Sequence, residues 1–217
     1  MVYNKSAFWK ALVITVIVFG IGILIGVYLE SYRTNLVEQK LMNSEMSLLD
    51  EQLRTKAFVD FNVSCSQQIE STFSFADRIY NEASQLEQYD AAAKFSDSLT
   101  LLHGRYDLLR MMLWSESVQI KAKCGPKFHT VVYFYDYNTQ DVQQRAEQTS
   151  VARVLMDLKA GHPYEVLLIP MAGNLGLDSV KVATDKYKVK TFPGVVIDEN
   201  KTLEGLTSVK EIEKIIF

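Results

Sequence analysis

The longest uncharged apolar segment of the chain lies close to its amino terminus. No charged residue occurs from Ala11 to Leu29, and a helix of this length spans about 28 Å, close to the hydrocarbon thickness of a bilayer. Trp9 and Tyr28 stand where interfacial aromatic residues are expected. The pattern therefore predicts a transmembrane helix over residues 11–29. A cleaved signal peptide is the alternative, although its apolar core would be shorter and would end in small residues.

The charges on either side of this segment predict its orientation. Lys5 and Lys10 precede it, whereas residues 30–40 carry both acidic and basic side chains. Because positive charge is retained on the cytoplasmic side, we expect residues 1–10 in the cytoplasm. The protein would then be a single-pass protein of the cell membrane, with its carboxyl-terminal part on the extracytoplasmic side.

The segment between the apolar span and Cys124 is predicted to be helical. From Val27 to Cys124 the chain has one glycine and no proline, and these are the residues that interrupt helices. We therefore expect a helical hairpin or bundle stalk over residues 30–124. Apolar residues recur at helical spacing in three stripes: Met42, Met46, Leu49, Leu53 and Ala57; Cys65, Ile69, Phe73, Ala76, Tyr80 and Ala83; and Phe95, Leu99, Leu102, Tyr106, Leu109, Leu113, Ser117, Ile120 and Cys124.

The first stripe has the spacing of a coiled coil but covers only two heptads, fewer than the three or four that such an assignment needs. Its simplest interpretation is one helix of a small bundle. Upstream, Gly22 and Gly26 are spaced like a small-residue pair that lets two membrane helices approach. A homodimer through these glycines and the juxtamembrane helix is therefore one hypothesis, although glycines are also common in membrane helices generally.

Both cysteines lie on core-facing stripes, at opposite ends of the helical segment. The midpoint between Cys65 and Cys124 falls beside residues 96–98, Ser-Asp-Ser, which favour a turn. In an antiparallel hairpin with its turn at this midpoint the two cysteines face each other, so we predict a Cys65–Cys124 disulfide. A turn at residues 87–90 is the alternative, and it would leave two separate buried thiols.

After Phe128 the pattern changes to β-branched and aromatic runs that alternate with helical periods. It predicts strands over residues 130–135, 164–169, 194–198 and 202–204, and helices over residues 142–159 and 178–187 and after Ser208. Asp178 and Ser208 are expected to cap helices, and N-capping also explains Asp136 and Asp141. The element order is β-α-β-α-β-β-α.

This order, together with the run Thr191-Phe192-Pro193-Gly194 before a strand, resembles the thioredoxin fold over residues 128–217. The resemblance implies that Pro193 is a cis-proline that opens the third core strand. It also implies a groove at Thr191, Phe192 and Pro193, where the residue before the proline offers backbone groups to an extended peptide. The alternative is that Pro193 serves only the fold.

The same resemblance locates a degenerate active site. Redox members of the family carry Cys-x-x-Cys after the first core strand, but this sequence has Asn138, Thr139, Gln140 and Asp141 there, and no cysteine after Cys124. Since dithiol exchange requires thiolates, this part of the chain is expected to be redox-inactive.

Composition excludes several other functions. A net charge of −3 with interspersed basic residues excludes a nucleic-acid-binding stripe. No histidine stands at metal-ligand spacing from cysteines or carboxylates, and no phosphate-binding loop is present. We therefore expect no metal, no cofactor and no nucleic-acid partner.

The sequence as a whole predicts an α+β protein: a transmembrane helix, a helical stalk and an α/β thioredoxin-like domain. Its predicted function is that of a membrane-anchored binding or adaptor module that holds polypeptide or serves as a subunit of a membrane complex. No catalytic constellation is apparent, so an enzyme is not expected. Two alternatives remain: a thiol-disulfide oxidoreductase or redox partner that uses Cys65 and Cys124, and a purely structural membrane-anchored dimer.

Overall fold

The computed structural model describes residues 5–90 and 97–217 and forms two compact units, Met1–Asn43 and Ser44–Phe217. Helix α1 (Lys5–Asp60) begins in the first unit and ends in the second. Among the described residues one helical segment, Phe8–Tyr32, is long and apolar enough to cross a membrane. The apolar helix predicted near the amino terminus is thus present.

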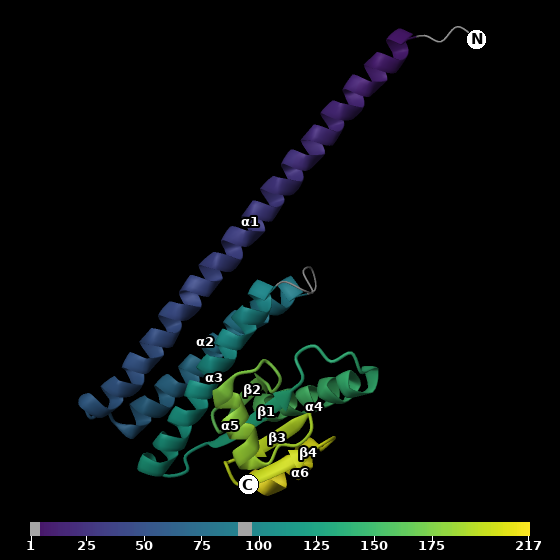
Figure 1. Ribbon diagram of the computed structural model, residues 1–217. Coiled ribbons are helices and arrows are strands. Elements are labelled where there is room, and N and C mark those ends of the chain that lie inside the picture. Colours follow the sequence, from purple (N-terminus) through teal and green to yellow (C-terminus); the bar gives the residue numbers. More distant parts are fainter. Residues whose placement is uncertain (1–4, 91–96) are drawn as a thin grey trace. The chain divides into compact units, whose positions relative to one another are not determined.

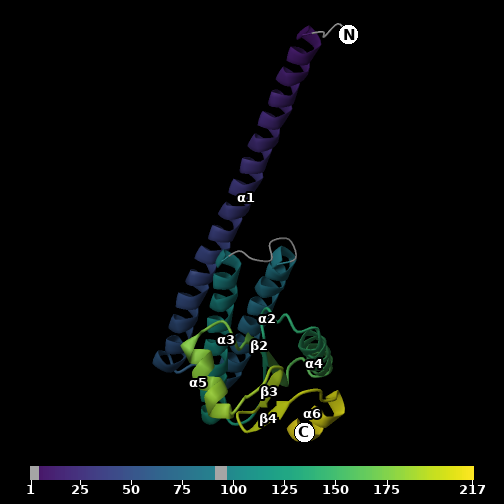
Figure 2. The ribbon, with the colours of Figure 1, turned by 45° about the vertical axis from the view of Figure 1, so that its right-hand side comes forward.

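Helices α2 (Cys65–Asp90) and α3 (Asp97–Cys124) lie side by side as a hairpin (Figures 1 and 2). The predicted turn beside residues 96–98 falls partly on residues 91–96, which lie outside the described residues. The α3 stripe is buried as predicted from Leu99 to Ile120. On α2 the predicted stripe is wrong at one position, because Ile79 is buried and Tyr80 is half exposed.

The last turns of α1 contact the hairpin mainly through polar and charged side chains. Arg54 donates from Nε to Glu51 Oε2 at 2.7 Å and from Nη1 to Ser71 Oγ on α2 at 3.0 Å. It also forms an ion pair with Glu116 of α3, whose Oε1 accepts a 3.2 Å hydrogen bond from Thr72 Oγ1. Glu51, Arg54 and Glu116 are called the charged cluster below. All three side chains are largely removed from water.

The charged cluster and the buried Phe58 lie on the side of α1 that faces the hairpin, and the predicted apolar stripe faces outward. Met46, Leu49 and Leu53 remain 68, 57 and 67% exposed. The prediction that this stripe packs within a small bundle is therefore wrong. The contact on the hairpin side combines polar and apolar groups, because the Arg54 guanidinium lies 4.8 Å from the centroid of the buried Phe58 ring.

Beyond the hairpin the chain alternates strands and helices in the predicted order. The sheet has the strand order β2-β1-β3-β4, in which β1 is parallel to β2 and antiparallel to β3, and β3 is antiparallel to β4. A mixed α+β architecture with a four-stranded mixed sheet is thus present in the described residues. The elements are β1 (His129–Tyr135), α4 (Val142–Gly161), β2 (Val166–Ala172), α5 (Asp178–Tyr187), β3 (Gly194–Ile197), β4 (Lys201–Glu204) and α6 (Val209–Ile216).

The sheet is covered on both faces (Figure 2). Helices α4 and α6 cover one face, where Val131, Leu155 and Ile212 belong to one buried apolar cluster. Helices α3 and α5 cover the other face, where the Trp114 ring on α3 meets Phe134 of β1 edge-on at 6.1 Å between ring centroids. Because α3 belongs to both the hairpin and this second layer, the helical segment and the sheet share one apolar interior.

The turn between β3 and β4 is anchored to α3. Asp198 and Glu199 have φ angles of 47° and 56°, a left-handed conformation that is uncommon for residues other than glycine. Their carboxylates accept hydrogen bonds from Lys121 Nζ at 3.0 and 2.6 Å. Glu199 also accepts one from Trp114 Nε1 at 2.6 Å, and His129 Nδ1 lies 2.6 Å from Asp198 Oδ2. These bonds offset the cost of the turn conformation.

The helix caps agree with the sequence at two of four predicted positions, because Asp136 lies in the loop before α4 and accepts from Asn138 N, and Asp178 is not a cap residue. Asp141 accepts hydrogen bonds from the first turn of α4, and Ser208 forms a reciprocal capping box with Glu211 at the start of α6. Asp178 was expected to cap α5, but the cap residue is Leu177 and no side chain caps this helix. Asp178 instead occupies the first helical position, where its negative charge is favoured by the helix dipole.

Candidate functional site

The predicted site residues gather where β1 and β2 end at the same edge of the sheet. The loop that follows β1 runs from Asp136 to Asp141, and Asn174 lies just beyond β2. Asn174 Nδ2 donates to Asp136 Oδ1 at 2.7 Å, and Tyr137 N donates to Asn174 Oδ1 at 2.9 Å. The loop of residues 136–141, which was predicted to be a degenerate Cys-x-x-Cys position, is therefore held in place by the segment after β2.

The second half of the site is the loop before β3. The Phe192–Pro193 peptide bond is cis, as the resemblance implied. Phe192 O accepts a 3.0 Å hydrogen bond from Gln144 Nε2 in the first turn of α4. Thr139 in turn donates its hydroxyl hydrogen to Gln144 Oε1. One glutamine side chain thus links two predicted site residues, Thr139 and Phe192.

Gln144 was not among the predicted site residues. It stands three residues after the N-cap Asp141, which is the spacing of a capping box, so its presence has an ordinary explanation at the level of sequence. In the structure its side chain points to Phe192 rather than to the backbone of the cap residue. A glutamine at this position next to a cis-proline loop is the signal that could have identified it.

The exposed residues of the predicted site are Asn138, Gln140 and Asp141 after β1 and Thr191 before β3. Thr191 is exposed, and the Phe192 N–H has no hydrogen-bond partner among the described residues. The Phe192 ring lies directly over Gly173, where an added Cβ would come within 2.0 Å of Phe192 Cζ. Intramolecular contacts therefore occupy the carbonyl and the ring of Phe192, whereas no described residue bonds to its N–H.

Helix α3 closes the site from the second face of the sheet. The rings of His103 and Tyr137 lie 4.5 Å apart. Asp107 accepts a hydrogen bond from Ala172 N at 3.1 Å and one from Arg110 Nη1 at 2.9 Å. Burial raises the pKa of Asp107, although Arg110 and the backbone N–H act in the opposite direction. These buried contacts fix the sheet edge to α3, and His103 itself is only 8% exposed.

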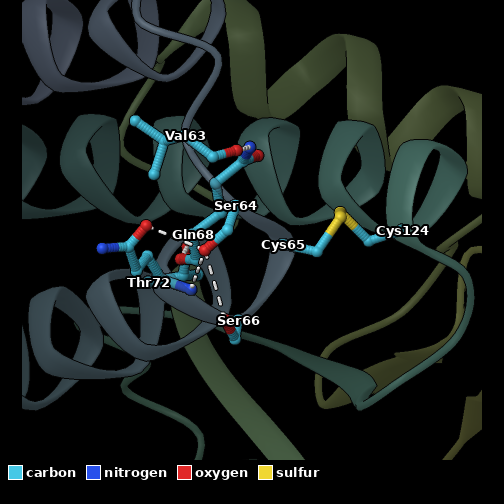
Figure 3. The surroundings of a disulfide bond; sticks show 8 residues. Val63, Ser64, Cys65, Ser66, Gln68, Thr72 and Cys124 are labelled. Carbon is cyan, nitrogen blue, oxygen red and sulfur yellow. Dashed lines mark hydrogen bonds between the residues drawn. A yellow bond between two sulfur atoms is a disulfide. The ribbon is translucent and has the colours of Figure 1, made fainter.

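Cys65 and Cys124 form the predicted disulfide (Figure 3). Cys65 is the first residue of α2 and Cys124 the last residue of α3, with 5.7 Å between their Cα atoms. Both residues are half-buried. Ser64, which precedes the bridge, accepts a 3.4 Å hydrogen bond from Gln67 N at its hydroxyl and so caps α2. The bridge adjoins the amino end of β1, about 20 Å along that strand from the candidate site.

The described residues contain no group of three histidine, cysteine or acidic side chains that could hold a metal ion. His129 and His162 lie against Phe217 and acidic side chains, which gives each of them a structural environment. A scan of the chain against models of known protein families finds no match. A search of curated proteins finds no significantly similar sequence.

Proposed function

We propose that this chain is a membrane-anchored, redox-inactive thioredoxin-like module that holds an extended segment of polypeptide beside Pro193. The strand order β2-β1-β3-β4, the helices on both faces and the cis peptide bond support the fold assignment. The observation that carries the function is the unpaired N–H of Phe192 next to exposed Thr191. An extended peptide satisfies such a group by main-chain hydrogen bonding, as in strand addition.

Two substitutions at one position test this proposal. Phe192→Pro removes both the ring and the N–H, whereas Phe192→Ala removes the ring and keeps the N–H. The full chain in detergent micelles is titrated into a fluorescently labelled, carboxymethylated and permanently unfolded polypeptide, and binding is followed by anisotropy. We expect binding by the wild type and by Phe192→Ala, and at least a tenfold weaker affinity for Phe192→Pro. Equal affinities of all three proteins, or no binding by the wild type, would contradict the proposal.

The chain is further proposed to expose its carboxyl-terminal part outside the cytoplasm. The basic residues before the membrane segment and the Cys65–Cys124 disulfide both support this orientation, since disulfides persist in oxidising compartments. A cysteine placed at Tyr164, an 82% exposed residue, reports the topology in intact cells. A membrane-impermeant maleimide labels it only if this part of the chain lies outside.

The second candidate function is thiol-disulfide exchange by Cys65 and Cys124. One observation favours it: Cys65 stands at the amino terminus of α2, where the helix dipole stabilises a thiolate. Insulin reduction by the purified chain tests this candidate. Turnover that disappears in Cys65→Ser would replace the binding function with a redox function, and absence of turnover in the wild type would remove the candidate.

A further inference from the structure

The side of α1 that faces away from the hairpin carries a continuous apolar stripe. Met46, Leu49 and Leu53 are 68, 57 and 67% exposed, and Met42 is 63% exposed. Their spacings of four, three and four residues are those of the a and d positions of a coiled coil. Isolated apolar side chains on a surface need no explanation, but a stripe with this spacing does.

The most buried residues of this part of α1 lie on the opposite side of the helix. With Met46 and Leu53 at position a and Leu49 at position d, Glu51 and Phe58 both fall at position f. These two residues are 0 and 9% exposed because they face the hairpin. Position f lies directly opposite the a and d positions of a heptad. The hairpin of the same chain thus covers the back of α1 and leaves the a and d positions open.

The heptad pattern continues towards the amino terminus. The same register assigns Asn35 to position d and Gln39 to position a, which are polar residues of the kind that fix the register of a coiled coil. Further upstream the a and d positions are apolar or aromatic again: Ile21, Ile25, Tyr28 and Tyr32. From residue 21 to residue 53 every a and d position except Asn35 and Gln39 is apolar or aromatic, so the register of the two apolar heptads in the stripe extends towards the amino terminus.

We propose that the stripe Met42, Met46, Leu49 and Leu53 is the seam of a parallel coiled coil with a second copy of this chain. The α1 helices of two copies anchored in one membrane with the same orientation run parallel. Each stripe residue is then as far along the helix from the membrane segment as its counterpart in the other copy, so identical residues can face each other. A two-fold interface needs such a self-complementary surface. The dimer is independent of whether the site beside Pro193 holds polypeptide.

The charges that flank the stripe are compatible with this partner. In the same register Glu45 occupies position g and Asp50 position e, so the two acidic side chains would approach each other across a parallel seam. Each of them is paired with an arginine of its own hairpin, Glu45 with Arg105 and Asp50 with Arg78. These pairs reduce the repulsion that two unpaired carboxylates would produce.

Cysteine cross-linking of the full chain in lipid vesicles tests the seam directly. Leu49→Cys places a thiol at a d position, and Leu101→Cys places one at a comparably exposed leucine of α3, at 54%. Under mild oxidation we expect a reducible dimer from Leu49→Cys at a yield at least five times that from Leu101→Cys. Equal yields would mean random collision and would overturn the proposal.

Charge insertion gives a second readout, the mass of the detergent-solubilised protein by light scattering. The wild type should be dimeric, the double variant Leu49→Lys/Leu53→Lys monomeric, and Leu101→Lys still dimeric. Circular dichroism and an intact Cys65–Cys124 bridge confirm that the variants are folded. A monomeric wild type at all concentrations refutes the dimer. A dimer that survives both lysines but is lost on Gly22→Leu would move the interface into the membrane and likewise refute the seam.

Discussion

Replacing Glu116 by glutamine should make the stability of the protein less dependent on pH. Burial and the hydrogen bond that Glu116 shares with Glu51 raise the pKa of Glu116 from 4.5 to about 8, while Arg54 acts in the opposite direction. At neutral pH this raised pKa favours the protonated form of Glu116. Glutamine has nearly the same shape as the protonated acid, can accept from Arg54, and does not titrate.

The magnitude follows from linkage between protonation and folding. Below pH 4.5 Glu116 is protonated in both the folded and the unfolded state, so wild type and Glu116→Gln should be equally stable. As the pH rises towards 8 only the unfolded state releases the proton, and the wild type loses stability relative to the variant. Since one pKa unit corresponds to about 1.4 kcal/mol, the variant should be more stable by about 5 kcal/mol at pH 8 and above.

Urea unfolding of the full chain in detergent, repeated between pH 4.5 and 8.5, measures this difference. A Trp9→Phe background leaves Trp114, which is buried on α3, as the single fluorescent reporter. Glu70→Gln, an exposed substitution on α2, is the matched control and should follow the wild type at every pH. A constant free-energy difference between Glu116→Gln and wild type over this range would show that Glu116 titrates normally and would refute the reasoning.

Three further predictions concern the turn, the bridge and the candidate site. Burial favours the neutral form of Asp198, but hydrogen bonds from a histidine, a backbone N–H and a lysine lower its pKa. Asp198→Asn should therefore lower the free energy of unfolding by about 2 kcal/mol at pH 7. In urea unfolding this cost should shrink as the pH falls through the lowered pKa. Replacing Cys65 and Cys124 by serine should lower the unfolding free energy by about 4 kcal/mol, and an unchanged urea midpoint would contradict a structural role. Gly173→Ala should displace the Phe192 ring and lower the free energy of unfolding by about 2 kcal/mol, as measured by thermal unfolding.

Local patterns in the sequence were sufficient to predict several features correctly. The disulfide followed from helical periodicity and from the equal rise of two antiparallel helices. The strand-helix order after Phe128 followed from the change between helical and alternating periods. The N-cap role of Ser208 followed from its position just before the last helical period. Each of these predictions depends on residues that are close in sequence or related by a simple hairpin.

The errors arise where a distant contact decides the outcome. The apolar stripe of α1 faces outward, whereas Arg54 on the side towards the hairpin pairs with Glu116, a residue of another helix that no periodicity in α1 reveals. The link from Gln144 to Phe192 depends on how a loop folds over the start of α4. The stripe predicted on α3 gave no signal that this helix would also cover the second face of the sheet, because Trp114 and Asp107, which contact the sheet, lie outside that stripe.

The double role of α3 has a consequence for biosynthesis. The chain is made from its amino terminus, so α3 is complete about 70 residues before β3 and about 80 before β4. Until α5 and the turn after β3 emerge, Trp114 lacks Tyr187 and Glu199, which it contacts in the folded protein. The nascent hairpin must therefore keep an apolar surface shielded while the remainder of the chain is translated. Conversely, a fragment that begins at residue 128 would lack the helix that covers one face of its sheet, and such bare faces promote aggregation.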